Sequence, residues 1–368
     1  MTRPLSDTLN RIAAGRRAIR VPAAGGSSRL TTQPPADRNP GALTAEAFVP
    51  AGLPAGAALV VALHGCTQSA AEYDRGTGWS TLAEREGFAV LFPEQARANN
   101  PNGCFNWFQP ADIAREGGEA ESIAAITRAM VEEHGIDPGR VFVTGLSAGG
   151  AMAGAMLAAW PDLFAGGAII GGLPHGCAAT VPEAFDRMRG GGADDAALAA
   201  AVTRAAAGYR GRWPAVSIWH GGADATVAPV NMDRIGRQWR GVHGLLDTAA
   251  AVDTGPGWTH RRWRDADGRT AVEEWSVAGM GHGVPIDPAG PDALGASGPY
   301  MLDVGLSSTA RIAAEWGLIG GGLATRDGGD VAPAPVAVAQ EVPHAPVPPV
   351  GRVQRVIEDA LRSAGLLR

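Results

Sequence analysis

The chain has 368 residues, with 31 basic and 37 acidic side chains and a formal net charge of -6. Hydrophobic residues make up 45% and charged residues 18%, proportions that exclude a chain disordered throughout and are typical of a folded core. All basic residues are arginine, which excludes P-loop phosphate binding, Schiff-base catalysis and serine–lysine dyads. The negative net charge argues against non-specific nucleic-acid binding. No apolar stretch approaches the about 18–20 residues of a membrane span.

Short apolar runs alternate with longer segments of helical periodicity between residues 41 and 318. Continuous apolar runs of strand length are typical of parallel strands buried on both faces. These runs are residues 58–63, 88–92, 141–144, 168–170 and 216–219. Helices are expected near residues 78–86, 117–134, 148–160 and 229–240. The alternation predicts an α/β fold with a doubly wound, mostly parallel sheet and helices on both faces.

Four segments stand apart from this regular alternation. Residues 1–40 read as an N-terminal lead segment that contains five arginines in its first half and no apolar run, so we expect a cytoplasmic protein. Residues 173–212 are long for a connection between two strands, and we expect a helical insertion there. Residues 319–351 are rich in Gly, Ala and Pro and indicate a linker. Residues 352–368 predict a short amphipathic helix that either packs on its own domain or docks with a partner, as in a homo-oligomer.

Residues 145–149 read Gly-Leu-Ser-Ala-Gly, the G-x-S-x-G pattern of a nucleophile elbow. A strand expected at 141–144 precedes the pattern and a helix expected at 148–160 follows it, which is the setting that an elbow requires. Small neighbours let a tight turn hold Ser147 in a strained conformation, with its hydroxyl at the carboxyl end of the sheet. The alternative is a serine in an ordinary glycine-rich turn.

A serine nucleophile needs a base, and the base needs a carboxylate to orient it. In hydrolases with this elbow, the acid follows the serine in the chain and the histidine follows the acid. Asp224 comes directly after the strand expected at 216–219, so its carboxylate is the candidate acid. Asp253 and Asp287 are rivals that follow no comparable central strand.

The candidate base is His282, which follows the strand-like residues 272–277 and lies between glycines that let a loop bend inward. His175 and His220 precede the acid, against the expected order. The other histidines lie in turns, polar connections or the linker: His64, His134, His243, His260 and His344. We interpret His64 and His220 as hydrogen-bonded structural residues.

An acyl-transfer site of this kind needs two backbone N–H groups to bind the oxyanion. One comes from the residue after the nucleophile, Ala148, and the other from the loop after an early strand. That loop is residues 63–68, Leu-His-Gly-Cys-Thr-Gln, and Cys66 is the expected donor because Gly65 allows a sharp turn before it. The chemistry requires no metal and no cofactor.

Several motifs together resemble the polyhydroxybutyrate depolymerase family of α/β-hydrolase esterases. They are LHGCTQ (63–68), NGCFNWF (102–108), GGEAESI (117–123), GLSAGGAM (145–152), WHGGADATV (219–227), GMGHGVP (279–285) and the segment at 298–318. The resemblance covers about residues 41–318 and implies the α/β-hydrolase fold. It also implies a Ser147–Asp224–His282 triad and an oxyanion loop at Cys66, in agreement with the assignment from the residues.

The expected function is therefore a serine esterase that hydrolyses short 3-hydroxyalkanoate esters or oligomers through an acyl-enzyme. The alternative is a carbohydrate esterase of the feruloyl or acetyl-xylan type, because the same family label covers such enzymes. A third interpretation is a non-catalytic interaction protein on a hydrolase scaffold.

Two details of the motifs remain open in the sequence. Cys66 and Cys104 both border the expected site, so they are candidates for a disulfide, but in a reducing cytoplasm we expect free thiols. Trp107 and Phe105 are candidates for an apolar wall that binds the acyl group, and the alternative is that these aromatic side chains belong to the core.

Overall fold

The computed structural model describes residues 28–192, 195–290 and 293–319. The helix expected at 352–368, and all of the expected linker at 319–351 except its first residue, lie outside the described residues. Within the expected lead segment, residues 31–32 form a short strand, β1, that pairs with β2. No helix in the described part of the chain is both long and apolar enough to cross a membrane.

The described residues contain a ten-stranded sheet in the order β1-β2-β4-β3-β5-β6-β7-β10-β9-β8. The six central strands, from β4 to β10, pair in parallel, whereas β1, β2, β9 and β8 pair antiparallel at the two edges. The strands are β1 (Thr31–Thr32), β2 (Thr44–Phe48), β3 (Leu59–Leu63), β4 (Ala89–Glu94), β5 (Val141–Leu146), β6 (Gly166–Ile170), β7 (Ala215–Gly221), β8 (Ala251–Gly255), β9 (Trp258–Arg264) and β10 (Thr270–Val277). A separate parallel pair joins β11 (Val284–Ile286) and β12 (Met301–Asp303).

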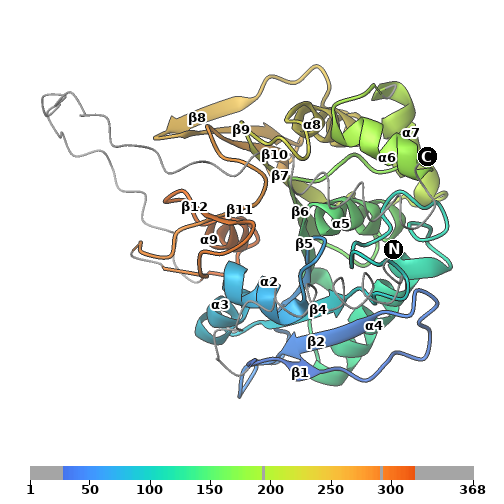
Figure 1. The fold of residues 1–368 in the computed structure, drawn as a ribbon, viewed down its shortest axis with the longest axis vertical. Coiled ribbons are helices and arrows are strands. Elements are labelled where there is room, and N and C mark those ends of the chain that lie inside the picture. The colour runs from blue at the N-terminus through green and yellow to red at the C-terminus, as the bar shows by residue number, and fades with distance from the viewer. Residues whose placement is uncertain (1–27, 193–194, 291–292, 320–368) are drawn as a thin grey trace, which may run out of the picture. The chain divides into compact units, whose positions relative to one another are not determined.

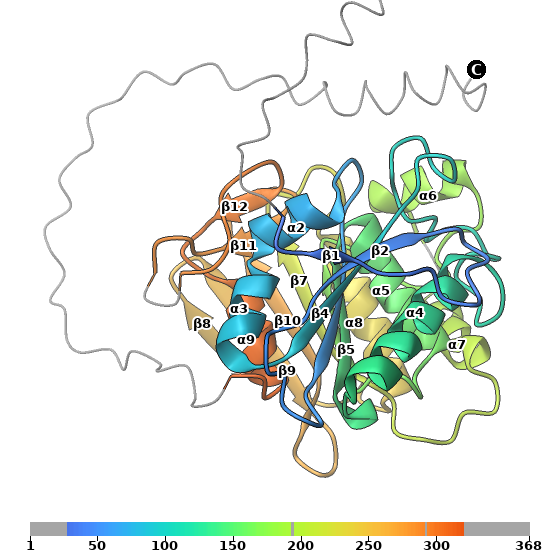
Figure 2. The same ribbon diagram turned by 90° about the horizontal axis from the view of Figure 1, so that it is seen from below.

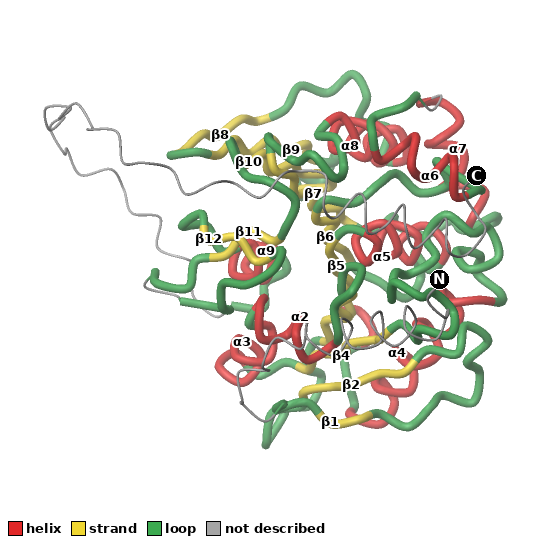
Figure 3. The backbone as a smooth tube through the Cα atoms, in the orientation of Figure 1, coloured by secondary structure: helices red, strands yellow, loops and turns green. Residues whose placement is uncertain are grey.

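Helices cover both faces of this sheet, as the side view in Figure 1 and the tube in Figure 3 show. One face carries α4, α5 and α8 with α6 and α7 beyond them, and the other carries α2, α3 and α9, a division that is also clear from below in Figure 2. The helices are α2 (Ala70–Thr77), α3 (Trp79–Glu86), α4 (Gly118–His134), α5 (Ala148–Ala159), α6 (Val181–Met188), α7 (Asp195–Ala205), α8 (Val230–Val242) and α9 (Ser308–Glu315), with a 3-10 turn, η1, at Pro138–Arg140. The doubly wound, mostly parallel α/β sheet predicted from the sequence is confirmed.

Burial explains why the central elements were readable as continuous apolar runs. Every residue of β3, β5 and β6 is buried, because helices cover both of their faces. Every residue of α5 is buried as well, which fits its composition of Ala, Gly, Met and Leu, since a helix that is apolar on all sides belongs in a core. The rigid centre of the molecule therefore lies directly behind the strand ends that carry the site.

The register of the central strands aligns their carboxyl ends. Leu63 pairs with Gly145, and Ile170 pairs with both Leu146 and Trp219. In doubly wound sheets, ligands bind at the carboxyl edge of the strands. The loops after β3, β5, β6, β7 and β10 thus meet at one edge of the sheet.

Candidate active site

Ser147 lies between β5 and α5 in a backbone conformation that residues other than glycine rarely adopt. Its φ is 58° and its ψ is -117°, and its amide donates a hydrogen bond of 2.8 Å to the carbonyl oxygen of Ile170 at the end of β6. A positive φ at a residue other than glycine stores strain of about 1–3 kcal/mol and recurs at functional sites. The strand–turn–helix setting expected for an elbow is thus present.

The glycines around Ser147 are required by the close approach of neighbouring backbone. A β-carbon at position 149 would lie 2.3 Å from the carbonyl oxygen of Leu63, and one at position 145 would lie 2.4 Å from the carbonyl carbon of Gly149. A β-carbon at position 150 would lie 2.8 Å from the carbonyl oxygen of Ile170. Packing against β3 and β6 therefore holds the turn rigid and excludes side chains at these positions.

Asp224 lies in the loop after β7 and is almost fully buried. Its Oδ2 accepts a hydrogen bond of 2.7 Å from Nδ1 of His282, and its Oδ1 accepts the amides of Thr226 and Val227, both at 2.8 Å. Burial by itself raises the pKa of Asp224, but the hydrogen bond and charge of His282, with the Val227 amide, outweigh it and hold the pKa below its usual value. The carboxylate is therefore ionised at neutral pH, and Nδ1 of His282 carries the proton that it accepts.

His282 follows β10 and packs against the strand end that binds the serine amide. A β-carbon at Gly171 would lie 3.2 Å from Cε1 of His282, and Gly171 directly follows Ile170, the acceptor for the Ser147 amide. With Nδ1 used by Asp224, Nε2 of His282 is the nitrogen left for the nucleophile. Ser147, Asp224 and His282 thus converge on one short stretch at the carboxyl edge of the sheet.

The two histidines interpreted as structural are buried and hydrogen-bonded. His220 Nε2 lies 2.9 Å from the carbonyl oxygen of Val227 and 3.4 Å from Oδ2 of Asp224. Burial lowers the pKa of His220, so its ring is neutral beside the acid. His260, expected in a polar connection, instead lies within β9, where its ring bonds Glu273 at 2.6 Å. The sequence misled here because the three arginines of β9 (WTHRRWR), two of them only partly exposed, conceal the alternation of a strand.

The loop after β3 leaves one of its amides free. The amides of Gly65, Thr67 and Gln68 donate to Gln68 Oε1, the Asn102 carbonyl and the Gly65 carbonyl. Among the described residues, no hydrogen bond uses the amide of Cys66. The amide of Ala148, at the first turn of α5, is likewise without an acceptor in the described part of the chain, as the first amides of a helix are. Two N–H groups are therefore available at this edge for a ligand oxygen.

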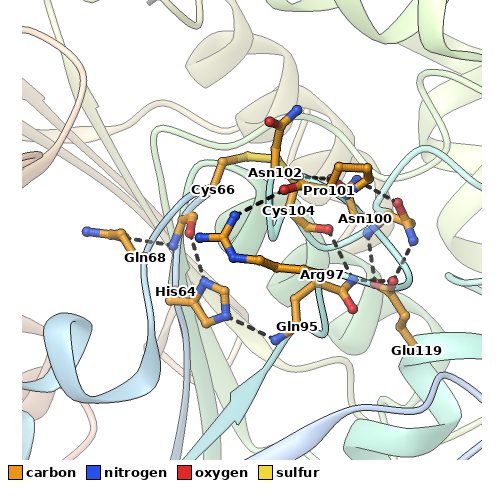
Figure 4. The surroundings of a disulfide bond; sticks show 12 residues. His64, Cys66, Gln68, Gln95, Arg97, Asn100, Pro101, Asn102, Cys104 and Glu119 are labelled. Carbon is orange, nitrogen blue, oxygen red and sulfur yellow. Dashed lines mark hydrogen bonds between the residues drawn. A yellow bond between two sulfur atoms is a disulfide. The ribbon is translucent and has the colours of Figure 1, made fainter. Parts of the chain in front are cut away.

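A disulfide joins Cys66 to Cys104, so the expectation of free thiols is wrong for this pair. The two loops lie side by side, since the Thr67 amide donates to the Asn102 carbonyl at 2.8 Å (Figure 4). Cys177, the other cysteine, is a buried free thiol whose pKa burial raises to about 12. The pairing could not be deduced from the chain because it depends on how two irregular loops meet.

We expect Cys104→Ser to lower both stability and turnover. Opening a loop with a sequence separation of 38 costs about 4 kcal/mol by the loop-entropy relation, and the Cys66 amide loses its covalent support, which we expect to reduce kcat by about 10- to 100-fold. Urea unfolding and initial rates measure the two effects. Dithiothreitol should reproduce both losses in the wild type and add nothing in the variant; an unchanged kcat in the variant would contradict the role given to the bridge.

The two aromatic residues proposed for the acyl wall lie in different environments. Phe105 is 0% exposed and belongs to the main core, 5.0 Å from the ring of His64. Trp107 is 8% exposed and packs in a smaller apolar cluster with Ala148, beside the nucleophile. Other members of this cluster come from the insertion or flank the site: Leu173, Ala184, Met188, Val227, Phe108 and the Cys66–Cys104 bridge. The structure thus places Phe105 in the core, and the sequence analysis missed the contribution of Leu173 and Met188.

Replacing the two aromatics separates these roles. Trp107→Ala should raise KM or lower kcat for esters with only a modest loss of stability, whereas Phe105→Ala should cost about 3–5 kcal/mol of folding free energy as a core cavity. Steady-state kinetics and thermal unfolding of the two variants provide the comparison. If Trp107→Ala left kcat/KM unchanged across ester substrates, Trp107 would have no part in substrate binding.

In the ranges that the structure describes, no group of three or more His, Cys, Asp or Glu side chains is arranged to hold a metal ion. The groups that the structure brings to the strand ends are a serine, a histidine, a carboxylate and two free amides, a combination that could perform acyl transfer.

The chain is similar to known esterases in sequence and in fold. The model of the family described as Esterase PHB depolymerase matches residues 46–262. Poly(3-hydroxyalkanoate) depolymerase C of Paucimonas lemoignei is 45% identical over 284 residues, which cover 77% of this chain and 68% of the relative. An acetylxylan esterase of Coprinopsis cinerea is 31% identical over 280 residues, covering 74% of this chain and 73% of the relative.

Feruloyl esterase B of Talaromyces funiculosus is 30% identical over 258 residues, covering 68% of this chain and 71% of the relative. Among solved structures, an acetyl xylan esterase from Aspergillus awamori superposes with a TM-score of 0.64 at 26% identity, covering 70% of this chain and 94% of that one. Fold and relatives together define a carboxylic ester hydrolase of the α/β-hydrolase class. Within that class, the chain belongs to the PHB depolymerase esterase family.

Proposed function

We propose that this protein hydrolyses short 3-hydroxyalkanoate esters or oligomers with Ser147, His282 and Asp224 as its catalytic triad. The observation that carries the proposal is the 2.7 Å hydrogen bond between His282 and Asp224 beside a serine held at a φ of 58°. In the first step His282 Nε2 takes the hydroxyl proton of Ser147 while Oγ attacks the ester carbonyl carbon. Asp224 keeps the proton on Nδ1 and stabilises the imidazolium that forms.

The negative charge of the tetrahedral intermediate falls on the former carbonyl oxygen. The free amides of Cys66 and Ala148 bind this oxygen, and one such donor is typically worth about 10²–10³ in rate. The intermediate collapses as His282 gives its proton to the leaving alcohol oxygen, which leaves an acyl ester on Ser147. Water, deprotonated by His282, then attacks the acyl carbon, and the acid product leaves with Ser147 reprotonated.

The substrate class is supported by relationship and by the lining of the site. A relative named as a poly(3-hydroxyalkanoate) depolymerase shares 45% identity over 77% of this chain. The cluster around Trp107 and Ala148 presents apolar side chains beside the nucleophile, as a short aliphatic acyl chain requires. The linked ester units of such an oligomer present one carbonyl at a time to the serine.

The experiment that tests this function compares initial rates on a 3-hydroxybutyrate trimer, methyl ferulate and p-nitrophenyl butyrate, with Ser147→Ala as the blank. A higher kcat/KM for the trimer than for the ferulate is expected. The reverse order would identify hydroxycinnamoyl esters as the preferred substrates. Cleavage of the activated nitrophenyl ester alone would support the mechanism and contradict the proposed substrate.

The second candidate is a carbohydrate esterase of the feruloyl or acetyl-xylan type. It is favoured by relatives with those names at 30–31% identity and by the superposition with an acetyl xylan esterase. Both candidates use the same triad, so only the substrate comparison separates them. The non-catalytic interpretation is tested differently: a fluorophosphonate probe should label Ser147 stoichiometrically, and the absence of label would favour a binding role.

The cytoplasmic location and the association through the C-terminal helix stay predictions. Disulfides persist mainly in oxidising compartments, so the Cys66–Cys104 bond is an argument against the first of them. Thiol counting on protein alkylated at once during lysis, compared between cell fractions, tests the location. Sedimentation of the full chain tests the association.

A further inference from the structure

A buried carboxylate that the proposed mechanism does not use lies behind the loop of residues 64–68. Glu119, in the first turn of α4, is 1% exposed. Its Oε2 accepts the backbone amide of Asn106 at 2.7 Å, and its Oε1 accepts Nδ2 of Asn106 at 2.7 Å. The same Oε1 accepts Nε2 of Gln95 (Figure 4). All three partners are donors, so the ionised carboxylate satisfies them all.

One route leads from Glu119 through Gln95 to the disulfide. Nε2 of Gln95, held by Glu119, also donates a hydrogen bond of 3.0 Å to the carbonyl oxygen of Cys104. Cys104 is covalently bound to Cys66. The position of the Cys66 backbone therefore depends on a residue that Glu119 fixes.

A second route runs from the backbone of Gln95 through His64. The Gln95 amide donates to Nε2 of His64 at 3.1 Å, and Nδ1 of His64 lies 2.8 Å from the carbonyl oxygen of Gly65. An amide can only donate and a carbonyl can only accept, so His64 is neutral with its proton on Nδ1. Burial lowers the pKa of His64, in agreement with this form.

The loop of residues 64–68, which both routes reach, contains a strained backbone conformation. Thr67 has a φ of 67°, a conformation that costs a residue with a branched side chain energy of about 1–3 kcal/mol. The Cys66 amide beside it has no partner among the described residues, so no hydrogen bond of its own fixes its direction. Its aim depends on the surrounding loop and the disulfide.

We propose that Glu119 is a positioning residue for the oxyanion loop, acting through Gln95 on both Cys104 and His64 so that the Cys66 amide points at the reacting carbonyl oxygen. The inference rests on the proposed function, because it takes Cys66 as an oxyanion donor. Glu119 itself does not touch the substrate.

A role in packing alone does not account for a carboxylate at this place. Burial raises the pKa of Glu119 to about 7, with a smaller contribution from the charge of Asp112, while the hydrogen bonds of Asn106 and Gln95 act in the opposite sense. Asp112, from the loop before α4, is the charged group that acts on Glu119, and the carboxylates of Glu94 and Glu72 act on His64. A raised pKa means that the folded state favours the protonated form, so stability is greatest below about pH 4.5 and falls as the pH rises through about 7. The ionised group thus lowers stability at the pH where its three hydrogen bonds are complete.

The test is Glu119→Gln, which preserves volume and removes the charge. Whichever way the new amide turns, its NH₂ faces a donor of Asn106 or Gln95, so at least one hydrogen bond is lost. We expect kcat to fall by about 10- to 100-fold at pH 8 with KM within about threefold, since a misaimed oxyanion donor acts on the transition state. Protonated Glu119 also places a hydrogen against one of these donors. The ratio of wild-type kcat to variant kcat should therefore fall as the pH is lowered from about 8 to about 5.

The ratio of wild-type kcat to variant kcat, measured as a function of pH, distinguishes a positioning role from a purely structural role. A general loss of packing would lower kcat without changing this ratio as the pH changes. Hydrogen exchange supplies a readout independent of substrate: amides in residues 59–69 should exchange faster in the variant. Thermal unfolding should show no large destabilisation, because the buried charge has been removed.

Glu121→Gln is the matched control. Glu121 lies in the same turn of α4 and is also buried, but it accepts the Gly117 amide at 2.6 Å and pairs with Arg38, away from the oxyanion loop. We expect this variant to keep the wild-type kcat, pH dependence and exchange of residues 59–69. A similar loss of kcat in both variants, or an unchanged kcat in Glu119→Gln, would overturn the proposal. Wild-type protein inactive on every ester, with faster loop exchange only in Glu119→Gln, would instead refute the esterase function and leave the positioning intact.

Discussion

Ser147→Ala should reduce kcat on every ester substrate by about 10⁴- to 10⁶-fold, the loss seen when a triad nucleophile is removed. In the proposed mechanism this hydroxyl forms the acyl-enzyme, and the methyl group of alanine cannot act as a nucleophile. KM should change little, because the apolar cluster around Trp107 and the two free amides remain. Stopped-flow or long-time-course assays of the purified variant measure the residual rate.

The matched control for this substitution is Ser307→Ala. Ser307 caps α9 by accepting the Ala310 amide, so its loss should cost about 1 kcal/mol of stability without affecting turnover. The assignment fails if Ser147→Ala keeps more than about one hundredth of the wild-type kcat. A fluorophosphonate label that persists on the alanine variant would point to a different nucleophile.

Asp224→Asn should be nearly as damaging, by about 10⁴-fold in kcat, and the hydrogen bonds of the loop explain why. Oδ1 accepts two backbone amides, from Thr226 and Val227, so the oxygen of the new asparagine stays there. Its NH₂ then faces Nδ1 of His282, which must become an acceptor and shift its proton to Nε2. A protonated Nε2 cannot take the proton of Ser147. The pH–rate profile and kcat of the folded variant measure this loss.

Asp253→Asn is the comparison for that variant. Asp253, the rival acid in the sequence, lies on the edge strand β8 in an exposed ion pair with Arg262. Its substitution should leave kcat unchanged, because exposed ion pairs contribute about 0–1 kcal/mol and this one lies away from His282. Equal losses in the two variants would remove Asp224 from its assigned role.

The central part of the fold was predictable because strands that are buried on both faces consist of continuous apolar runs. The apolar runs at 58–63 and 141–144 became β3 and β5 with small shifts in their bounds. The edge strands were not predicted: β2 alternates buried and exposed residues, and β8 is almost wholly exposed. Such strands have no continuous apolar signal, and their pairing is decided by partners that lie far away in the chain.

The backbone setting of the candidate site was predictable where local geometry restricts the residue type. Glycines beside Ser147 are required because an added β-carbon would lie as close as 2.3 Å to neighbouring backbone, so the elbow has a sequence signature. No comparable rule distinguishes Phe105 from Trp107. The two residues lie two positions apart in an irregular loop, where Phe105 packs in the core and Trp107 packs beside the candidate site. The contacts of Glu119 were hidden for the same reason, since its partners Gln95 and Asn106 come from two other segments.

The origin of the apolar cluster has a consequence for how such enzymes diverge. The proposed triad stands at the ends of core strands, where a β-carbon added at Gly145, Gly149 or Gly150 would collide with backbone. Part of the apolar cluster beside Ser147, by contrast, comes from residues 173–188, including Leu173 and Met188, outside the central sheet. Mutations in that one segment can therefore reshape the wall proposed to contact the acyl group and leave the elbow intact, which is a physical route by which related esterases come to differ in the esters that they cleave.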